Sequence, residues 1–230
     1  YEIVDCDWSS DVCSSDLQAR LLYQHAATRI GSDADEDRLA YFRDAPEFRN
    51  LTLLELPHSP GLVPGGVGER DYGVTIVRNF LYSAFMLPVW DALSRSTDAH
   101  LAAIADKSAK ETQYHLRHSH DWLVRMGDGT DESHRRAQDA LDYLYTFTRE
   151  FWVETGYEAQ ACKAGIAPDL TAIRTNWNAQ VDDTLAEATL QRPPEAGHVP
   201  TGKQGVHSEH LSYLLSEMQS LARAHPGATW

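Results

Sequence analysis

The chain has 230 residues, of which 42% are hydrophobic, and carries a formal net charge of −14 with a pI near 5.1. This length and apolar content suffice for one domain with a substantial core. The negative charge repels phosphate backbones and acidic lipid head groups, which argues against nucleic-acid and electrostatic membrane binding. No apolar run is long enough to span a bilayer and no signal-peptide pattern opens the chain, so we expect a soluble, cytoplasmic protein.

The first residues differ in character from the rest. Asp7–Leu17 reads DWSSDVCSSDL, which has no apolar period and which matches the translation of a common sequencing-adapter primer. We therefore interpret residues 1–17 as a disordered artefact of gene assembly, the alternative being a natural disordered tail. Cys6 and Cys13 then say nothing about disulfides or metal sites in the natural protein. The remaining Cys162 has no partner, which fits a reducing compartment and excludes a disulfide framework or a cysteine zinc site.

In chain order, the apolar spacing first predicts a helix over Gln18–Ile30, which has no natural capping residue before it. Prolines and glycines then break the chain, and we expect short helices at Asp35–Arg43 and Phe48–Glu55 and no regular structure between Pro57 and Gly68. Longer helices follow at Tyr72–Leu93, Asp98–Met126, Thr130–Thr155, from Pro168-Asp169 to Pro193-Pro194, and at Ser208–Arg223.

The helix predicted for Tyr72–Leu93 is apolar around much of its circumference, which places it in the middle of a bundle. Pro88 should bend it or remove one backbone hydrogen bond. Asp98 should cap the next helix, and Gly127-Asp128-Gly129 should end it in a left-handed turn. Because no strand pattern or internal repeat stands out, the sequence predicts an all-α fold, a four-helix bundle with extra helices.

The segment around Glu111 almost matches a half-site of a di-iron carboxylate protein. In such proteins a glutamate and a histidine three residues later project inward from one helix. Here the third residue after Glu111 is Tyr114, and His115 and His118 follow at offsets of four and seven. These side chains share a helix face, so metal binding is possible, but a face of histidines hydrogen-bonded to other helices explains the pattern without a metal and is the favoured interpretation.

A second candidate cluster comprises His207, His210 and Glu217 near the end of the chain. On a helix they share a face with several leucines, so at least one imidazole must enter an apolar interface and find a hydrogen bond there. His207 and His210, three residues apart, could hold a metal, although hydrogen-bonded core histidines are the commoner case.

A di-iron site also needs single glutamates from two further helices. Glu55 is a weak candidate because prolines shorten its helix, and Tyr72–Leu93 offers no glutamate on its inward face. Glu150 and Glu154 are expected to face solvent. The sequence therefore predicts no catalytic residue, no cofactor and no metal site in this chain.

Two stretches, KETQYHLRHSHDWLVRMGDGTDES from Lys110 and TGKQGVHSEHLSYLLSEMQSLARAHPGATW from Thr201, closely resemble the PaaC family of bacterial phenylacetyl-CoA 1,2-epoxidase subunits. The resemblance extends over nearly all of Gln18–Trp230. It implies a ferritin-like helical bundle that pairs with a homologous catalytic subunit, which carries a di-iron centre and binds phenylacetyl-CoA. It further implies a small extra subunit and a reductase with flavin and an iron-sulfur cluster, supplied with NADPH and oxygen.

Members of the PaaC family lack the di-iron centre and serve as a scaffold, so the resemblance implies a non-catalytic structural subunit in phenylacetate catabolism. The shifted motif at Glu111 would then be a relic of a di-iron ancestor. The family begins with a complete helix and half of a second, which this sequence replaces with residues 1–17. We therefore expect residues 18–230 to form a single ferritin-like domain whose first core helix is missing.

Two rival hypotheses remain from the residues themselves. One is a metal-binding oxygenase whose centre of altered geometry is built from Glu111, His115, His207, His210 and Glu217. The other is a stand-alone ferritin-like storage protein, which would form a homo-oligomer without any other subunit.

Overall fold

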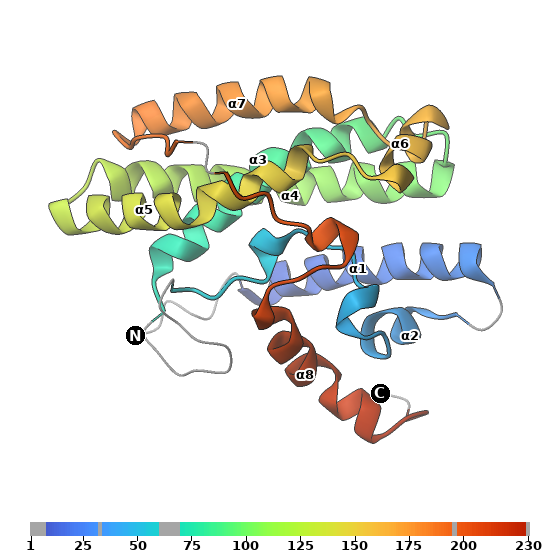
Figure 1. The fold of residues 1–230 in the computed structure, drawn as a ribbon. Coiled ribbons are helices and arrows are strands. Elements are labelled where there is room, and N and C mark those ends of the chain that lie inside the picture. The colour runs from blue at the N-terminus through green and yellow to red at the C-terminus, as the bar shows by residue number, and fades with distance from the viewer. Residues whose placement is uncertain (1–7, 32–33, 60–69, 195–196, 229–230) are drawn as a thin grey trace.

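A computed structural model describes residues 8–31, 34–59, 70–194 and 197–228, and Figure 1 shows the resulting arrangement of helices. Within these ranges the regular elements are helical, and the nearest approach to a sheet is one isolated bridge between Thr201 and Val206. The α-helices are α1 (Trp8–Ile30), α2 (Glu36–Tyr41), α3 (Tyr72–Leu93), α4 (Ala99–Gly127), α5 (Asp131–Leu144), α6 (Gly156–Lys163), α7 (Leu170–Glu187) and α8 (Glu209–Ala224). The 3-10 helices are η1 (Ala45–Glu47), η2 (Thr52–Leu54), η3 (Tyr145–Trp152) and η4 (Gly202–Gln204). The predicted all-α fold is confirmed.

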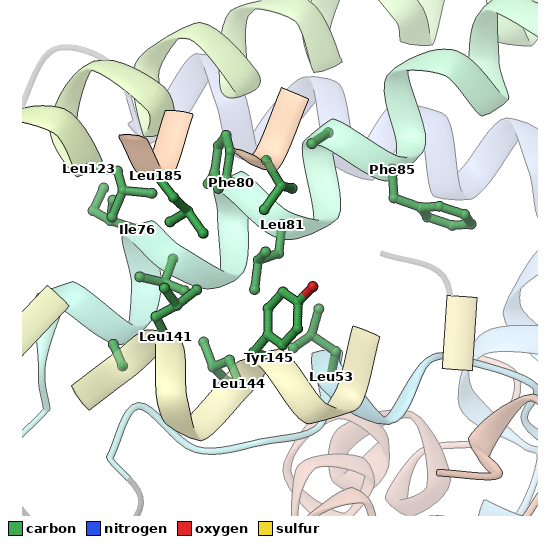
Figure 2. Close-up of a cluster of buried hydrophobic side chains, with 14 of the residues drawn as sticks. Leu53, Ile76, Phe80, Leu81, Phe85, Leu123, Leu141, Leu144, Tyr145 and Leu185 are labelled. Carbon is green, nitrogen blue, oxygen red and sulfur yellow. The ribbon is translucent and has the colours of Figure 1, made fainter. Parts of the chain in front are cut away.

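Helix α3 lies at the centre of the bundle, as its apolar circumference predicted. It packs along α4 and is covered further by α5, α7 and η3, while α1 lies against α4 (Figure 1). Leucine, isoleucine and aromatic side chains from α3, α4, α5, α7 and η3 meet in one core (Figure 2). The buried indole of Trp177 on α7 donates a hydrogen bond of 3.2 Å to the carbonyl oxygen of Leu81 on α3. Apolar packing with one satisfied polar group therefore fixes α7 on α3.

Side-chain caps set the starts of the long helices. Asp71, Asp98, Thr130 and Asp169 each accept hydrogen bonds from backbone N–H groups in the first turn of α3, α4, α5 and α7. These N–H groups have no partner inside the helix, so a carboxylate or hydroxyl at this position stabilises the helix end. The cap predicted at Asp98 is confirmed.

The predicted left-handed stop after α4 is wrong. Neither Gly127 nor Gly129 has a positive φ, and the helix continues through Gly127. The need for glycine is steric instead: a Cβ at Gly127 would lie 2.0 Å from the carbonyl oxygen of Ala188. The absence of a side chain lets the end of α7 cross the end of α4 at this point.

The single helix predicted from Thr130 to Thr155 is also wrong in its second half. After α5 the chain tightens into η3, and α6 follows as a separate helix that was not predicted. Within η3 the buried side chains Tyr145, Thr148 and Phe151 follow at strict intervals of three, the repeat of a 3-10 helix. A period of three keeps them on one line facing the core, where an α-helix would rotate them away.

The predicted helix over Phe48–Glu55 is likewise replaced, by the short turn η2 alone. The reason is tertiary, because the backbone N–H of Thr52 donates to the buried Glu150 carboxylate at 2.7 Å. Of the predicted loop from Pro57 to Gly68, residues 60–68 lie outside the described residues.

Of residues 1–17, the first seven also lie outside the described residues. From Trp8 the backbone is already part of α1, where we predicted no regular structure. Extending an existing helix costs little, because each added residue gains one backbone hydrogen bond. The origin of residues 1–17 in gene assembly, the single domain over 18–230 and the missing core helix stay predictions.

Candidate functional site

Glu111 and His115 lie on one face of α4, as their spacing predicted, and this face contacts α1. The Glu111 carboxylate accepts a hydrogen bond from the side-chain amide of Gln18, and its second oxygen lies 3.6 Å from Nε2 of His115. Both side chains are largely shielded from solvent, with 14% and 23% of their surface exposed. The Glu111 carboxylate thus contacts an amide and an imidazole, and α3, which also packs on α4, offers it no buried carboxylate.

His118 belongs to a different neighbourhood on α4. Its ring stacks on Tyr114 at 6.1 Å between centroids and lies tilted against Trp122 at 6.4 Å. Trp122 in turn meets Tyr72 of α3 edge-on and the guanidinium of Arg125. The ring of His118 is therefore one member of an aromatic row and not a partner of Glu111 in these contacts.

His207 is bound on both sides by protein oxygens. Its Nδ1 lies 2.6 Å from Oε1 of Glu55, and its Nε2 lies 3.1 Å from the carbonyl oxygen of Phe48. A carbonyl oxygen only accepts, so Nε2 donates and carries a hydrogen. Neither ring nitrogen is then available to a metal without breaking a buried hydrogen bond.

Glu55 is the centre of this second cluster. Besides His207 it accepts hydrogen bonds from the N–H and hydroxyl of Ser208, at 2.8 and 2.7 Å, and from the Asn50 amide at 2.8 Å. Its side chain is 1% exposed. The sequence singled out His207 and treated Glu55 as a weak ligand; the structure makes them a pair that ties the start of α8 to η2.

His210 and Glu217 do not join that pair. Ser208 is the residue before α8, so His207 precedes the helix and does not form the predicted helical pair with His210. Glu217 is exposed two turns further along α8. The structure therefore separates the second predicted cluster into a buried clamp at His207 and two residues on α8 itself.

Glu150 was predicted at the surface, and this is wrong: it is completely buried. One carboxylate oxygen accepts the N–H of Thr52 at 2.7 Å and the other the N–H of Lys203 at 2.8 Å. Glu154, four residues later, is exposed as predicted. Glu150 therefore joins the starts of η2 and η4, which lie far from it in the sequence, by charge-assisted hydrogen bonds.

A third polar cluster links the end of α1 to the start of α4. The Asp98 carboxylate caps α4 and also binds Nε2 of His25 at 2.9 Å and the Arg29 guanidinium at 2.6 Å. The backbone N–H of Leu101, followed by His25, holds the pKa of Asp98 well below its usual range. The His25 ring stacks on His100 at 4.7 Å. This arrangement joins the end of α1 to the start of α4.

The donor set does not fit a di-iron centre. In α3, the neighbour of α4, the only carboxylate is the exposed Asp91 near its end. Thr75 and Ser83 occupy positions on α3 where ligands would be wanted, and the Thr75 hydroxyl binds His58 at 2.8 Å. No group of three or more His, Cys, Asp or Glu residues able to hold a metal occurs in the described part of the chain. Two irons with open positions need several carboxylates together, and the described residues do not supply them.

A groove of about 710 Å³ lies between α3, α4 and α7. Apolar side chains of all three helices line it together with polar ones such as Asp91, Gln113 and Gln180. Across the described ranges, none of the helices combines the length and the hydropathy that a membrane span requires.

Comparison with known proteins identifies the family of this fold. The model of a family described as "Phenylacetic acid catabolic protein" matches residues 17–230. The chain belongs to this family. A curated relative, the C-subunit of the 1,2-phenylacetyl-CoA epoxidase from Escherichia coli (strain K12), is 38% identical over 213 residues, which are 93% of this chain and 81% of the relative. The predicted family resemblance is confirmed, and the all-helical fold agrees with a ferritin-like bundle in this family of phenylacetic acid catabolic proteins.

Proposed function

We propose that this phenylacetic acid catabolic protein is a non-catalytic structural subunit of a phenylacetyl-CoA 1,2-epoxidase, which binds and stabilises a homologous di-iron catalytic subunit. The family and the 38% identity to a subunit of such an epoxidase support the assignment to the complex. The catalytic subunit would hold the di-iron centre, and a separate reductase would hold flavin and the iron-sulfur cluster.

The observation that carries the non-catalytic role is the environment of Glu111. Its carboxylate is taken up by Gln18 and His115, and the adjacent α3 has no buried carboxylate to complete a metal pair. Both ring nitrogens of the other candidate, His207, are bound by protein oxygens, those of Glu55 and of the Phe48 carbonyl. These residues act as hydrogen-bonded supports of the helix contacts, a role that needs no metal.

Co-expression with the catalytic subunit tests the proposal. We expect the two chains to purify together, and we expect the catalytic subunit to unfold at a lower temperature when it is prepared alone. Binding of a protein to the native state raises stability by mass action, so the shift should grow with the concentration of this chain. Failure of the two chains to associate, at concentrations where each is folded, would contradict the proposal.

Metal analysis of this chain, prepared without other subunits in the presence of ferrous iron, separates the scaffold from its rivals. We expect iron well below one atom per chain, and the same result for Glu111→Ala and for the exposed control Glu154→Ala. Stoichiometric iron that Glu111→Ala abolishes and Glu154→Ala retains would establish a metal centre of this chain and overturn the scaffold role.

A further inference from the structure

Arg78, near the start of α3, is a half-buried positive charge that pairs with no carboxylate in the described part of the chain. Its Nη2 donates to the carbonyl oxygens of Leu56, at 2.8 Å, and Pro57, at 2.9 Å. Its Nε is shielded from solvent and has no hydrogen-bond partner among the described residues. Burial lowers the pKa of the guanidinium. Two carbonyl groups replace only part of the hydration that this charge has lost, so it is poorly compensated.

Two more basic side chains lie beside Arg78. His58 follows the two residues whose carbonyls bind Arg78, and its Nδ1 lies 2.8 Å from the hydroxyl of Thr75, one turn earlier on α3. The carbonyl oxygen of His58 accepts the backbone N–H of Asp71 at 3.0 Å, which brings Arg70 next to His58. Burial first, and then the charges of Arg78 and Arg70, lower the pKa of His58. Both arginines therefore lie close enough to act on one imidazole.

Tyr143 of α5 adds a hydroxyl group to these side chains. Burial raises the pKa of Tyr143 and the charge of Arg78 opposes that rise, so the phenol lies within electrostatic range of the guanidinium. Within the described ranges, neither the Tyr143 hydroxyl nor Nε2 of His58 has a hydrogen-bond partner. Both groups can therefore donate to a ligand. We call Arg70, Arg78, His58 and Tyr143 the Arg78 cluster.

The carboxylates that flank the cluster in the sequence are bound elsewhere. Glu55 accepts hydrogen bonds from the start of α8. Asp71 caps α3, and the exposed Asp142 accepts a hydrogen bond from Gln138 at 2.9 Å. Glu69 lies outside the described residues. In a chain with a formal net charge of −14, two arginines that form no ion pair in the described ranges are an uncommon concentration of positive charge.

An oxyanion is the ligand that this set of donors fits. Guanidinium groups bind phosphate and carboxylate oxygens through several charge-assisted N–H···O bonds, and a hydroxyl and an imidazole N–H add further donors. Two arginines supply a charge of +2. A phosphate group on a hydroxyl carries a charge of about −1.5 to −2 at pH 7, which two arginines balance, whereas a carboxylate carries only −1. The charge of the cluster therefore favours phosphate.

We propose that the Arg78 cluster binds a phosphate group, either the free ion or the phosphate group of a small metabolite, where α3, α5 and the segment after η2 converge. The ligand contacts would come from three separate elements of the chain. Bound phosphate should therefore hold these elements together and stabilise the folded chain. This site is distinct from the clusters at Glu111 and His207, and its test does not depend on the proposed function.

Titration calorimetry of the full chain with sodium phosphate, at an ionic strength kept constant with sodium chloride, tests the proposal. We expect one phosphate per chain and a thermal midpoint that rises with occupancy. Arg78 also holds two loop carbonyls, so its replacement would test folding as well as binding. Arg70→Gln changes an exposed residue and Tyr143→Phe removes only a hydroxyl, so both variants should keep the fold. Each should raise the Kd for phosphate at least threefold.

Arg117→Gln is the matched control, because it removes the same charge from an exposed arginine on α4. Its Kd should stay within twofold of the parent chain. Equal increases of Kd in Arg70→Gln and Arg117→Gln would refute the site, since they would report only the net charge of the chain. The absence of both binding heat and a midpoint shift in the parent chain would refute it as well.

Other ligands and one further variant identify what the cluster binds. Tighter binding of glycerol phosphate than of inorganic phosphate would support a phosphate ester as the ligand, and the reverse would support the free ion. Sodium acetate that binds as tightly as phosphate would assign the cluster to a carboxylate and overturn the proposal. Phosphate binding that appears only in Glu69→Gln would show that the chain supplies its own counter-charge, which would also overturn it.

Discussion

Replacement of Glu150 by glutamine should strongly destabilise the chain. Each carboxylate oxygen of Glu150 accepts one backbone N–H, from Thr52 at 2.7 Å and from Lys203 at 2.8 Å. A glutamine keeps one acceptor oxygen and places an NH₂ group against the other N–H. The site is fully buried, so no water replaces the lost acceptor. Losing one charge-assisted bond and leaving a buried donor unpaired should cost about 2–4 kcal/mol.

Urea and thermal unfolding of Glu150→Gln measure this effect, with Glu154→Gln as the matched control four residues away. For a domain of this size the expected loss lowers the midpoint by roughly 4–16 °C. The exposed control should stay within about 0.5 kcal/mol of the parent chain. If the two variants were equally stable, the clamp between η2 and η4 would not hold these segments, and our reasoning about buried carboxylates would be wrong.

Two further predictions concern stability. Gly127→Ala should destabilise the chain by about 1–3 kcal/mol, because its Cβ would collide with the Ala188 carbonyl; Gly156→Ala, with open space around it, should stabilise by about 0.4–1 kcal/mol. Thermal unfolding of both variants checks that Gly127→Ala lowers the midpoint and Gly156→Ala raises it. The pKa of Asp98 is lowered in the folded chain. Ionised Asp98 therefore stabilises the folded state at pH values above the ordinary carboxyl pKa, and this stabilisation is lost as the pH falls toward the folded-state pKa. Urea unfolding should therefore show the largest loss of unfolding free energy for Asp98→Asn, relative to the parent chain, near pH 7. This difference should become smaller in acid, and a difference independent of pH would contradict the prediction.

The long helices could be predicted from sequence because their signals are local. Asp98 and Asp169 cap their helices through residues two or three positions away, and Tyr72–Leu93 was predicted with the bounds that α3 has. The helix α6 was missed although Thr155 and Glu158 form a capping box, a local signal that would have found it. The interval of three between Tyr145, Thr148 and Phe151 also occurs on one face of an α-helix, so it does not distinguish η3 from a continuation of α5.

The polar contacts could not be predicted in the same way because their partners are remote. Glu150 is separated from Thr52 by 98 residues, and His207 from Glu55 by 152. A glutamate is usually a surface residue, and only the tertiary fold shows which backbone N–H groups converge on Glu150 or Glu55. The same fold turned Phe48–Glu55 away from a helix, because a buried carboxylate captures the N–H that a helix would use.

The positions of the buried carboxylates bear on the scaffold role. A di-iron bundle needs its carboxylates between the long helices, where they repel one another unless a metal neutralises them. Here Glu55 and Glu150 lie outside the α3–α4 contact, where Glu55 binds the backbone N–H of Ser208 and Glu150 binds those of Thr52 and Lys203. The core between the long helices is left to apolar packing. Glu55 ties the start of α8 to η2, and Glu150 ties η2 to η4, so both buried carboxylates connect segments of the chain through backbone N–H groups, a role that needs no metal.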